Sequence, residues 1–226
     1  MPEAVTLCIT MGKRPELLQQ TLRSLFERVQ VDHVLAVNDF LDDDTNDAFR
    51  DVCPWGQLVL PPHHVGHHPA VDLLYQHVKT PYVFHCEDDW LFEHSIDLAQ
   101  CQQLLREEPA LSMVCFRSIR DVAEAFTHEP VTQAKAMPYV RLDQHHAQWY
   151  GYTFNPHLAS LDLWRSLGGF SQFRKERHIS RHLRKQGRVV AYAANGPCAH
   201  LGADDSVSTP AVTPGRWSEW WRGLFR

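Results

Sequence analysis

The sequence predicts an α/β domain in which helices flank a mostly parallel β-sheet. Short apolar runs alternate along the chain with segments whose apolar residues recur at helical spacing. This alternation favours a parallel sheet, because each strand is followed by a helix that crosses back over one face. A chain of 226 residues with 44% hydrophobic residues suffices for one sizeable core. We therefore expect a single domain over residues 1–226.

The first half of the chain supplies the elements on which this fold class depends. Val5 to Thr10 is a nearly continuous apolar run that predicts a strand, and Gly12 and Pro15 then mark a turn. Helical spacing of apolar residues follows at Leu17, Leu18, Leu22, Leu25 and Phe26. The next expected elements are a strand from His33 to Asn38, a strand from Gln57 to Leu60, a helix from Pro69 to His77 and a strand at residues 81–86.

The second half is organised differently. A long polar stretch from Ser118 to Gln148 predicts an irregular segment, either a binding loop or a disordered region. The remaining expectations are a helix from Ser95 to Glu107, strands from Ser112 to Arg117 and from Tyr152 to Asn155, a helix from Leu158 to Leu167, a turn at residues 168–170, a helix from Glu176 to Gln186 and a strand from Val189 to Ala193.

Three consecutive carboxylates, Glu87, Asp88 and Asp89, follow the apolar strand at residues 81–86. Adjacent acids repel one another, so a cation or strong hydrogen-bond donors must offset their charge. Hard oxygen ligands on a short turn suit Mg²⁺ or Mn²⁺, and a solvated acidic turn is the alternative. Thr10 and Asp39 also end strands, so they are expected at the same ligand-binding edge of the sheet.

Composition limits the partners and the compartment. The formal charge of −5 gives no overall basic surface, which argues against nucleic acid as the main partner. Six cysteines without a CxxC pair are typical of small buried residues in a reducing cytosol. The sequence shows no basic leader with an apolar stretch and no apolar run of membrane-spanning length. We expect a cytoplasmic protein, soluble or peripheral at the inner face of the membrane.

Five features form a recognisable pattern: the strand at residues 5–10, the helix after it, Asp39, the acids at residues 87–89 and Gly168-Gly169-Phe170. Taken together, they resemble a family 2 glycosyltransferase of the GT-A fold. The order and spacing match over nearly the whole chain. The resemblance implies a metal-dependent enzyme that moves a sugar from a nucleotide-sugar donor to a saccharide or lipid-linked saccharide acceptor, with inversion. A UDP-sugar is the favoured donor, and surface polysaccharide synthesis is the implied setting.

The resemblance also implies roles for residues on the donor side. Asp39, which lies in Val-Asn-Asp-Phe where the family usually has Val-Asp-Asp-Gly, would contact the nucleoside. Thr10, Arg14 and Asp88 complete the expected donor set. Asp89 would bind the metal, with Glu87 in the first acidic place of the family's DXD motif and His200 as a third contact. A metal there would offset the charge of the departing diphosphate.

Glu176 is the expected base that deprotonates the acceptor hydroxyl. It is the only acid from Arg174 to Arg188, and nearby cations would keep it ionised. The alternative is an ion pair with Arg177 or Arg181 on a solvated helix. The same basic cluster, which includes Arg174, Lys175, Arg181 and Arg184, is either a solvated face or a contact for an anionic acceptor or the donor phosphates.

Aromatic and histidine-rich segments complete the candidates. Trp90, Trp149 and Tyr150 are possible stacking surfaces for acceptor sugars, with core packing as the alternative. The histidines at residues 63–68 invite a transition-metal interpretation but lack acidic or thiolate partners. The Trp-rich tail at residues 214–226 could anchor the chain peripherally to a membrane or pack against protein.

Two rival functions remain open. A nucleotidyltransferase shares the sheet topology, but it would normally carry a glycine-rich loop with a lysine, of which residues 11–14 (Met-Gly-Lys-Arg) are a poor version. A non-catalytic module that binds a saccharide or a protein partner is the other rival. It is motivated by the missing second acid beside Glu176 and by the missing glycine after Asp39.

Overall fold

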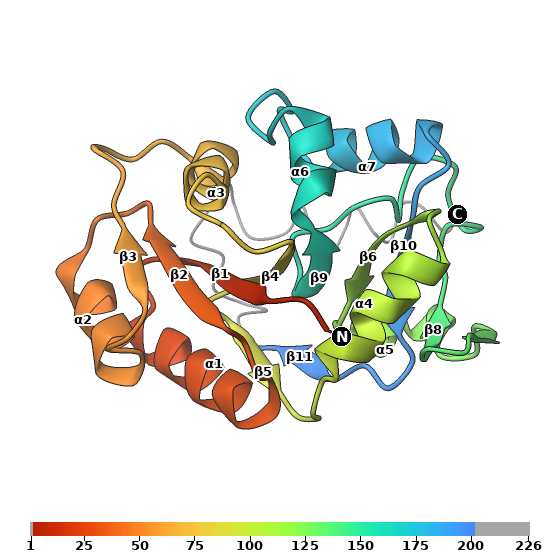
Figure 1. Cartoon of the computed structure of the whole chain (residues 1–226), viewed down its shortest axis with the longest axis horizontal. Helices are drawn as coiled ribbons and strands as arrows, with labels where there is room; N and C mark the ends of the chain where they lie inside the picture. Colours follow the sequence, from red (N-terminus) through yellow and green to blue (C-terminus); the bar gives the residue numbers. More distant parts are fainter. Residues whose placement is uncertain (1, 202–226) are drawn as a thin grey trace.

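A computed structural model describes residues 2–201 of the chain, and Figure 1 shows a central sheet with helices packed on both of its faces. The strands are β1 (Val5–Met11), β2 (His33–Asn38), β3 (Gln57–Val59), β4 (Tyr82–Glu87), β5 (Trp90–Phe92), β6 (Leu111–Cys115), β7 (Val131–Gln133), β8 (Pro138–Val140), β9 (His157–Ser160), β10 (Val189–Ala193) and β11 (Cys198–His200). The helices are α1 (Pro15–Arg28), α2 (Asp43–Val52), α3 (His67–Tyr75), α4 (Leu98–Glu107), α5 (Ile119–Val122), the 3₁₀ helix η1 (Glu124–Phe126), α6 (Leu161–Leu167) and α7 (Glu176–Lys185). The predicted α/β class is confirmed.

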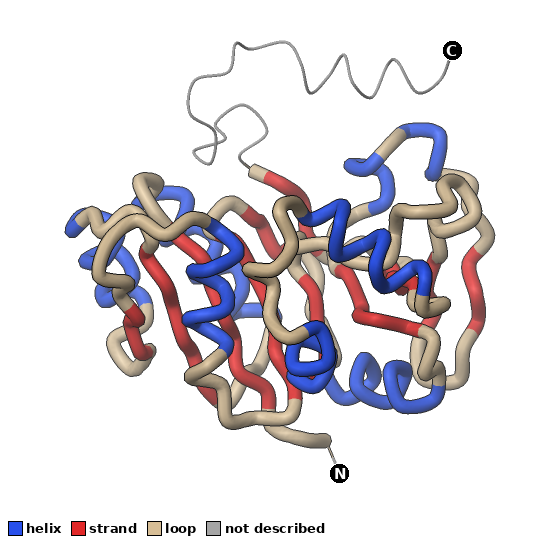
Figure 2. Tube along the Cα trace, turned by 90° about the horizontal axis from the view of Figure 1, so that it is seen from above, coloured by secondary structure: helices blue, strands red, loops and turns tan. Residues whose placement is uncertain are grey.

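The main sheet has nine strands in the order β3-β2-β1-β4-β9-β6-β10-β8-β7. Strands β3, β2, β1 and β4 form one parallel block, and β6 and β10 form another. The short strand β9 lies between the blocks and is antiparallel to both β4 and β6. Seen from above in Figure 2, the strands lie next to one another through the middle of the molecule. A separate two-stranded sheet pairs β5 with β11.

Two apolar layers hold the helices to the sheet. Helices α1, α2 and α4 bury their leucines and phenylalanine against one face, together with alternate residues of β1 such as Leu7 and Ile9. Helices α3, α6 and α7 cover the other face, which Cys8 of β1 faces. This division follows from the two-residue period of a strand, which sends successive side chains to opposite faces. All six cysteines are buried and free, and the sequence predicted burial for several of them.

The structure corrects several sequence-based boundaries. Tyr152 to Asn155 is not a strand but a buried loop, and the ladder forms later, at β9. The following helix begins at Leu161 rather than Leu158, because residues 157–160 pair with β4 and β6 on both sides. The aromatic side chains of Tyr152 and Phe154 fill the core from a loop, so apolar character alone misidentified the strand.

Several short elements were also missed. Helix α2 begins at the cap residue Asp42, whose side chain accepts a hydrogen bond from Thr45 N. The stretch from Ser118 to Gln148, expected to be irregular, contains α5, η1, β7 and β8. The Trp-rich tail at residues 214–226 lies outside the described residues. Among residues 2–201, no helix is long and apolar enough to cross a membrane.

Candidate functional site

The candidate site lies where β1 and β4 end side by side. Parallel pairing places Thr10 opposite Glu87, so the loop after β1 and the acids after β4 meet at one edge of the sheet. The backbone N–H of Gly12 donates a hydrogen bond to Asp88 Oδ2 over 2.9 Å. A side chain at residue 12 would meet the ring of Phe40, so this close approach requires glycine. The predicted convergence of the two strand ends is therefore present.

Arg14 neutralises the acidic cluster from within the protein. Its guanidinium donates through Nη1 to Asp89 Oδ2 over 2.7 Å, and through Nη2 to Asp88 Oδ1. Both carboxylates are buried. Burial and the neighbouring Asp89 charge raise the pKa of Asp88 to about 6, although Arg14 and the Gly12 amide oppose the rise. Arg14 was expected on the donor side, and here it bridges two of the three acids.

Asp89 and His200 form the second part of the cluster. His200 Nε2 lies 3.2 Å from Asp89 Oδ2, because β11 pairs with β5 and brings residue 200 opposite Trp90. Burial favours a raised pKa for Asp89, but the contacts with His200 and Arg14 outweigh it and lower that pKa. The other carboxylate oxygen, Asp89 Oδ1, is buried without a hydrogen-bond partner among the described residues.

This arrangement decides how well the predicted metal ligands fit a divalent ion. Within residues 2–201 no group of three or more His, Cys, Asp or Glu side chains is arranged to hold a metal. Mg²⁺ and Mn²⁺, however, need only one or two protein ligands when phosphates and water complete the shell. Asp89 fits that requirement through its unpartnered buried oxygen, with His200 beside it. The histidines at residues 63–68 form no such group either.

Glu87 lies beside this pair in a more strongly desolvated position. Burial first, and then the charges of Asp89, Glu176 and Asp88, raise the pKa of Glu87 to about 8. The interaction with Glu176 shows that the acids after β4 and the first residue of α7 share one electrostatic environment. The structure thus brings together residues that are 89 positions apart in the chain.

Glu176 is directed into the protein rather than toward the cations of its own helix. Its Oε2 accepts a hydrogen bond from Phe154 N over 3.0 Å. Burial raises the pKa of Glu176, while the Phe154 amide and the charge of Arg117 oppose the rise. Within the described part of the chain, Glu176 forms no ion pair with Arg177 or Arg181. The expectation that nearby cations of the helix control its charge is therefore wrong.

Arg117 was missed by the sequence reasoning. It follows β6, donates through Nη1 to Asn155 Oδ1 over 3.2 Å, and lies 5.7 Å above the Trp90 ring. Trp90 is only 1% exposed and packs between Arg117 and His200, whose ring centroid is 4.8 Å away. Because Trp90 is buried, no acceptor ring can stack on it in this structure. The position of Arg117 at the end of a predicted strand was the available signal.

Asp39 organises the loop before α3. Its two carboxylate oxygens accept hydrogen bonds from the backbone amides of Val65, at 2.7 Å, and Gly66, at 2.8 Å. His64 Nδ1 lies 2.9 Å from Asp39 Oδ2, and the His64 ring stacks on Phe40 at a centroid distance of 5.1 Å. The histidine-rich segment therefore forms one wall beside the expected nucleoside position.

The Gly168-Gly169-Phe170 turn is held by Asp72, a contact that the sequence analysis did not predict. Asp72 of α3 accepts hydrogen bonds from Phe170 N at 2.7 Å and Ser171 N at 2.8 Å. The indole Nε1 of Trp164 also donates to Asp72, at 2.7 Å. Gly169 has φ +91°, and a side chain there would meet the Asp72 carboxylate. The turn therefore fixes the chain just before α7, which carries Glu176.

Trp149 and Tyr150 lie beside α7 rather than at the acids after β4. Ser180 Oγ of α7 donates to Gln148 O over 3.3 Å, and the Trp149 ring stacks on His146 at 4.0 Å. Tyr150 contacts Tyr192 of β10 at a ring-centroid distance of 6.4 Å. Any acceptor that contacts these rings would approach along α7.

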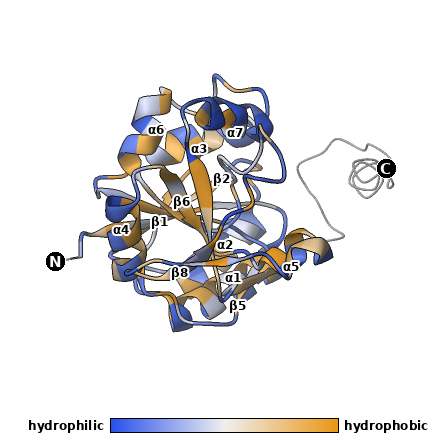
Figure 3. Cartoon of the chain, turned by 90° about the vertical axis from the view of Figure 1, so that its right-hand side faces the viewer, coloured by the Kyte–Doolittle hydropathy of each residue, from blue (hydrophilic) through white to orange (hydrophobic). Residues whose placement is uncertain are grey.

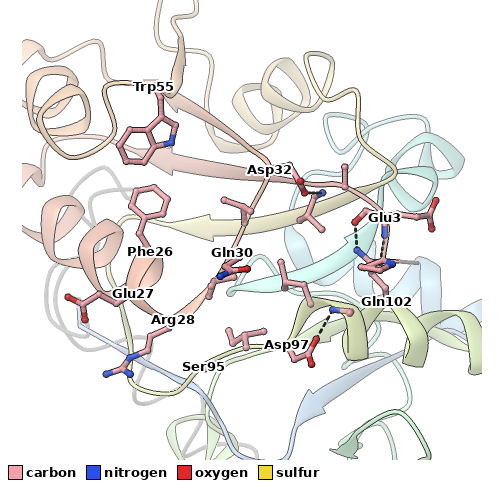
Figure 4. Close-up of a pocket in the computed structure, with 18 residues that line it drawn as sticks. Glu3, Phe26, Glu27, Arg28, Gln30, Asp32, Trp55, Ser95, Asp97 and Gln102 are labelled. Carbon is pink, nitrogen blue, oxygen red and sulfur yellow. Dashed lines mark hydrogen bonds between the residues drawn. The ribbon is translucent and has the colours of Figure 1, made fainter.

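A groove of about 1160 Å³ lies at the opposite end of β1 (Figure 4). Asp32, whose carboxylate accepts from Val5 N, lines it together with Phe26 and Trp55, which is 67% exposed. None of the predicted site residues lines this groove. The groove is therefore separate from the candidate site at the carboxyl ends of the strands.

Comparison with known proteins supports the fold. No protein-family model matches the sequence, and a search of curated proteins finds no match. Among solved structures, the chain is similar to the mannosyltransferase PcManGT from Pyrobaculum calidifontis in complex with GDP-Man and Mn²⁺, with a TM-score of 0.69 and 17% identity. The match covers 99% of this chain and 61% of that protein. The likeness shows that the chain has the fold of that glycosyltransferase, and membership of family 2 stays a prediction.

Proposed function

We propose that the chain is a glycosyltransferase that moves a sugar from a nucleoside diphosphate sugar to a saccharide or lipid-linked saccharide acceptor, with inversion. One observation carries the proposal. Asp88 and Asp89, which are buried and bridged by Arg14, directly follow Glu87, and Glu87 interacts electrostatically with the half-buried Glu176. In this proposal, these residues would supply the leaving-group and base chemistry at one edge of the sheet.

Glu176 is the proposed base. Burial raises its pKa, so its carboxylate is a stronger proton acceptor than an exposed glutamate, and the Phe154 amide holds one of its oxygens. In the reaction, the acceptor hydroxyl gives its proton to Glu176 as its oxygen bonds to the anomeric carbon. The bond between that carbon and the diphosphate oxygen breaks, and the electron pair leaves with the diphosphate. A retaining mechanism would need no such base.

Cationic side chains are available for the leaving group. Arg14, which contacts Asp89, and Arg117, which lies above Trp90, would offset negative charge that develops on the diphosphate. Asp89 and His200 would hold a divalent metal, Mn²⁺ or Mg²⁺, which supplies further neutralisation of that charge when bound. Glu87, whose pKa is raised to about 8, is a weaker candidate ligand, because metals bind the ionised carboxylate.

The donor base is chosen by analogy. The sequence resemblance favours a UDP-sugar, whereas PcManGT was solved with GDP-Man. Asp39, Thr10 and the wall formed by His64 and Phe40 are the proposed nucleoside contacts. Because the fold alone connects the two proteins, GDP-mannose and UDP-sugars are both primary candidates. A cytoplasmic location, with peripheral membrane contact through residues 214–226, remains part of the proposal.

The first test is a thermal-shift panel of nucleoside diphosphates and their sugars, each with and without Mn²⁺. Ligands that bind the native state raise the melting temperature according to their affinity. We expect a metal-dependent rise with one base that Asp89→Ala removes and Asp47→Ala, an exposed carboxylate control, retains.

The two rivals predict different outcomes of this panel. A nucleotidyltransferase would bind a nucleoside triphosphate most tightly and release pyrophosphate. A non-catalytic module would show no donor turnover, and Glu176→Gln would then change no rate. No shift with any nucleotide or nucleotide sugar would contradict the transferase proposal.

A further inference from the structure

The segment from Arg174 to Arg188 concentrates positive charge in an otherwise acidic protein. It contains seven of the chain's 22 basic residues and only one of its 27 acids, Glu176. Five of the seven basic residues have exposed side chains, and we call them the basic face of α7: Arg174, Lys175, Arg177, Arg181 and Lys185. In Figure 3, α7 is drawn mostly in the colour of hydrophilic residues.

The other two cations of the segment serve the fold. Arg184 pairs with Asp143 Oδ2 at 3.3 Å and donates to its carbonyl. Arg188 donates to the backbone carbonyls of Pro109 and Leu111. The basic face differs, because no ion pair or hydrogen bond is recorded for its five side chains within residues 2–201.

The arrangement of the basic face does not favour stability. Arg177, Arg181 and Lys185 follow one another at intervals of four residues, so they lie along one side of the helix. Like charges at that spacing cost a few tenths of a kcal/mol per pair. Partial burial and the charges of Arg177, Arg181, Lys175 and Arg174 lower the pKa of His178, which lies among them. Among the residues that the structure describes, this repulsive cluster therefore has no paired counterion.

The position of the basic face relates it to the proposed reaction. It begins on either side of Glu176, whose carboxylate points inward to Phe154 N while its neighbours point outward. From Arg177 to Lys185 the row is about 12 Å long, at a helical rise of about 1.5 Å per residue. A ligand that delivers a hydroxyl to Glu176 and continues along α7 would lie beside several cations in succession.

We propose that the basic face of α7 binds an anionic saccharide chain, so that the acceptor carries carboxylate, sulfate or phosphate groups beside the sugar that is extended. This inference rests on the proposed function for the identity of the ligand as an acceptor. Complementary charge would steer such a chain toward α7, because the rest of the protein is strongly acidic and repels it. Trp149, which stacks on His146 beside α7, offers an adjacent aromatic surface.

A saccharide is favoured over a membrane surface by what surrounds the basic face. Interfacial helices combine cations with exposed apolar anchors that enter the headgroup region. Among residues 2–201 the exposed large apolar side chains are Leu41, Trp55, Leu60 and Val131, and none lies in α6, α7 or the turn between them. The described part of the basic face therefore has charge without an anchor.

The test measures direct binding of defined glycans to the full chain. The probes are heparin and polygalacturonate oligosaccharides, with dextran oligosaccharides as the neutral control. The variant Arg177→Gln/Arg181→Gln/Lys185→Gln is compared with Arg23→Gln/Arg28→Gln/Lys79→Gln, which removes equal charge from exposed positions elsewhere. Thermal unfolding of both variants checks that each is folded.

We expect both anionic glycans to bind at least tenfold more tightly than dextran, and the α7 variant to lose at least tenfold in affinity with a shallower salt dependence. The control variant should stay within twofold of the natural protein. A nucleoside diphosphate should bind together with the glycan, since an acceptor and a donor occupy the site at the same time.

Three results would overturn the inference. The α7 variant could retain full glycan affinity, the nucleoside diphosphate could compete with the glycan, or vesicles containing phosphatidylglycerol could be the probe whose binding depends on the three cations. Failure of the proposed function is distinguishable, because it would remove every nucleotide-dependent thermal shift and leave the glycan measurements unaffected.

Discussion

The acids after β4 and the basic face of α7 are two strongly charged regions of the described chain, and they differ in burial and in pairing. Asp88 and Asp89 are buried, and Arg14 and His200 contact them directly. The cations of α7 are exposed, and no acid of the described chain pairs with the five of the basic face. Within residues 2–201, Asp88 and Asp89 have cationic or histidine partners, whereas the side chains of the basic face have no acidic partner.

This difference distinguishes buried charge from exposed charge in a site. Buried charge must be compensated by the fold itself, since an unpaired ion in the interior is costly. Exposed charge is solvated, so it needs no partner in the fold and is available to bind a ligand. Glu176 lies where the two regions meet. Its carboxylate accepts a hydrogen bond from Phe154 N and interacts electrostatically with Glu87, so it belongs with the acids rather than with the basic face.

The largest expected effect comes from Glu176→Gln. If the buried carboxylate is the base, transfer falls by about 10²- to 10⁴-fold, because a neutral amide cannot accept the acceptor proton. The donor-induced thermal shift should persist, since the donor contacts are elsewhere. Sugar transfer is measured as release of nucleoside diphosphate, with Glu27→Gln, an exposed glutamate, as the control. Equal transfer by both variants would remove Glu176 from the chemistry.

Asp72→Ala should destabilise the protein by about 3 kcal/mol or more, because it leaves four donors, two of them on Ser171, without their acceptor. It should also lower transfer, since the Gly-Gly-Phe turn that precedes α7 loses its anchor. The free energy of unfolding is measured by urea denaturation. Asp47→Ala, whose carboxylate is exposed, should change it by less than about 0.5 kcal/mol. A small effect of Asp72→Ala would contradict the anchoring role.

The buried histidine pair of His85 and His157 predicts a pH dependence of stability. His157 stacks on His85 across β4 and β9, and burial lowers the pKa of His157 to about 4 from 6.5. The unfolded chain therefore binds this proton more readily, so stability is retained above pH 6.5 and lost as the pH falls toward 4. The loss is about 3 kcal/mol for this group.

Thermal unfolding between pH 4 and pH 7.5 measures that loss. His157→Phe should flatten the dependence, whatever its effect on stability at pH 7, and the exposed His33→Phe should not. An unchanged slope in His157→Phe would show that other groups control acid stability.

The smallest expected effect is that of Arg14→Gln on metal affinity. Arg14 and a metal ion compete for the same carboxylates, so its removal should raise the affinity for Mn²⁺ about tenfold in the absence of nucleotide. Electron paramagnetic resonance of free Mn²⁺ measures this directly, with Lys13→Gln as the matched control. Unchanged or weaker Mn²⁺ binding in Arg14→Gln would mean that the arginine and the metal use different sites.

Much of the first half of the fold could be predicted from the sequence, because β1, β2, β3 and β4 are short apolar runs and their order follows the chain. The meeting of Thr10 with Glu87 followed from parallel pairing alone. Strand β9 could not be predicted in this way. Its four residues, His-Leu-Ala-Ser, form a strand because β4 and β6 pair with them on either side. Both of these strands are distant in the chain, so the local sequence does not indicate the pairing.

The sequence predicted which residues belong to the candidate site better than it predicted the contacts between them. The acids, His200 and Glu176 were expected, but the role of Arg14 as their cation and the presence of Arg117 were not. Both arginines act through long side chains that reach other elements, and no local pattern records such a reach. Asp72 was overlooked because its partners are amides about 98 residues away, which sequence periodicity does not encode.

The single short strand β9 has a consequence for how the protein is made. The block of β1 to β4 is complete once residue 87 has been synthesised, so it can begin to fold early on the ribosome. The two blocks cannot join until residues 157–160 have been synthesised, because these residues form the strand between them. Glu176 and His200 are synthesised later still. During that interval the nascent chain exposes the β4 edge. We expect this edge to be where chaperones engage the nascent chain, and the candidate site to assemble only after residue 200 has been synthesised.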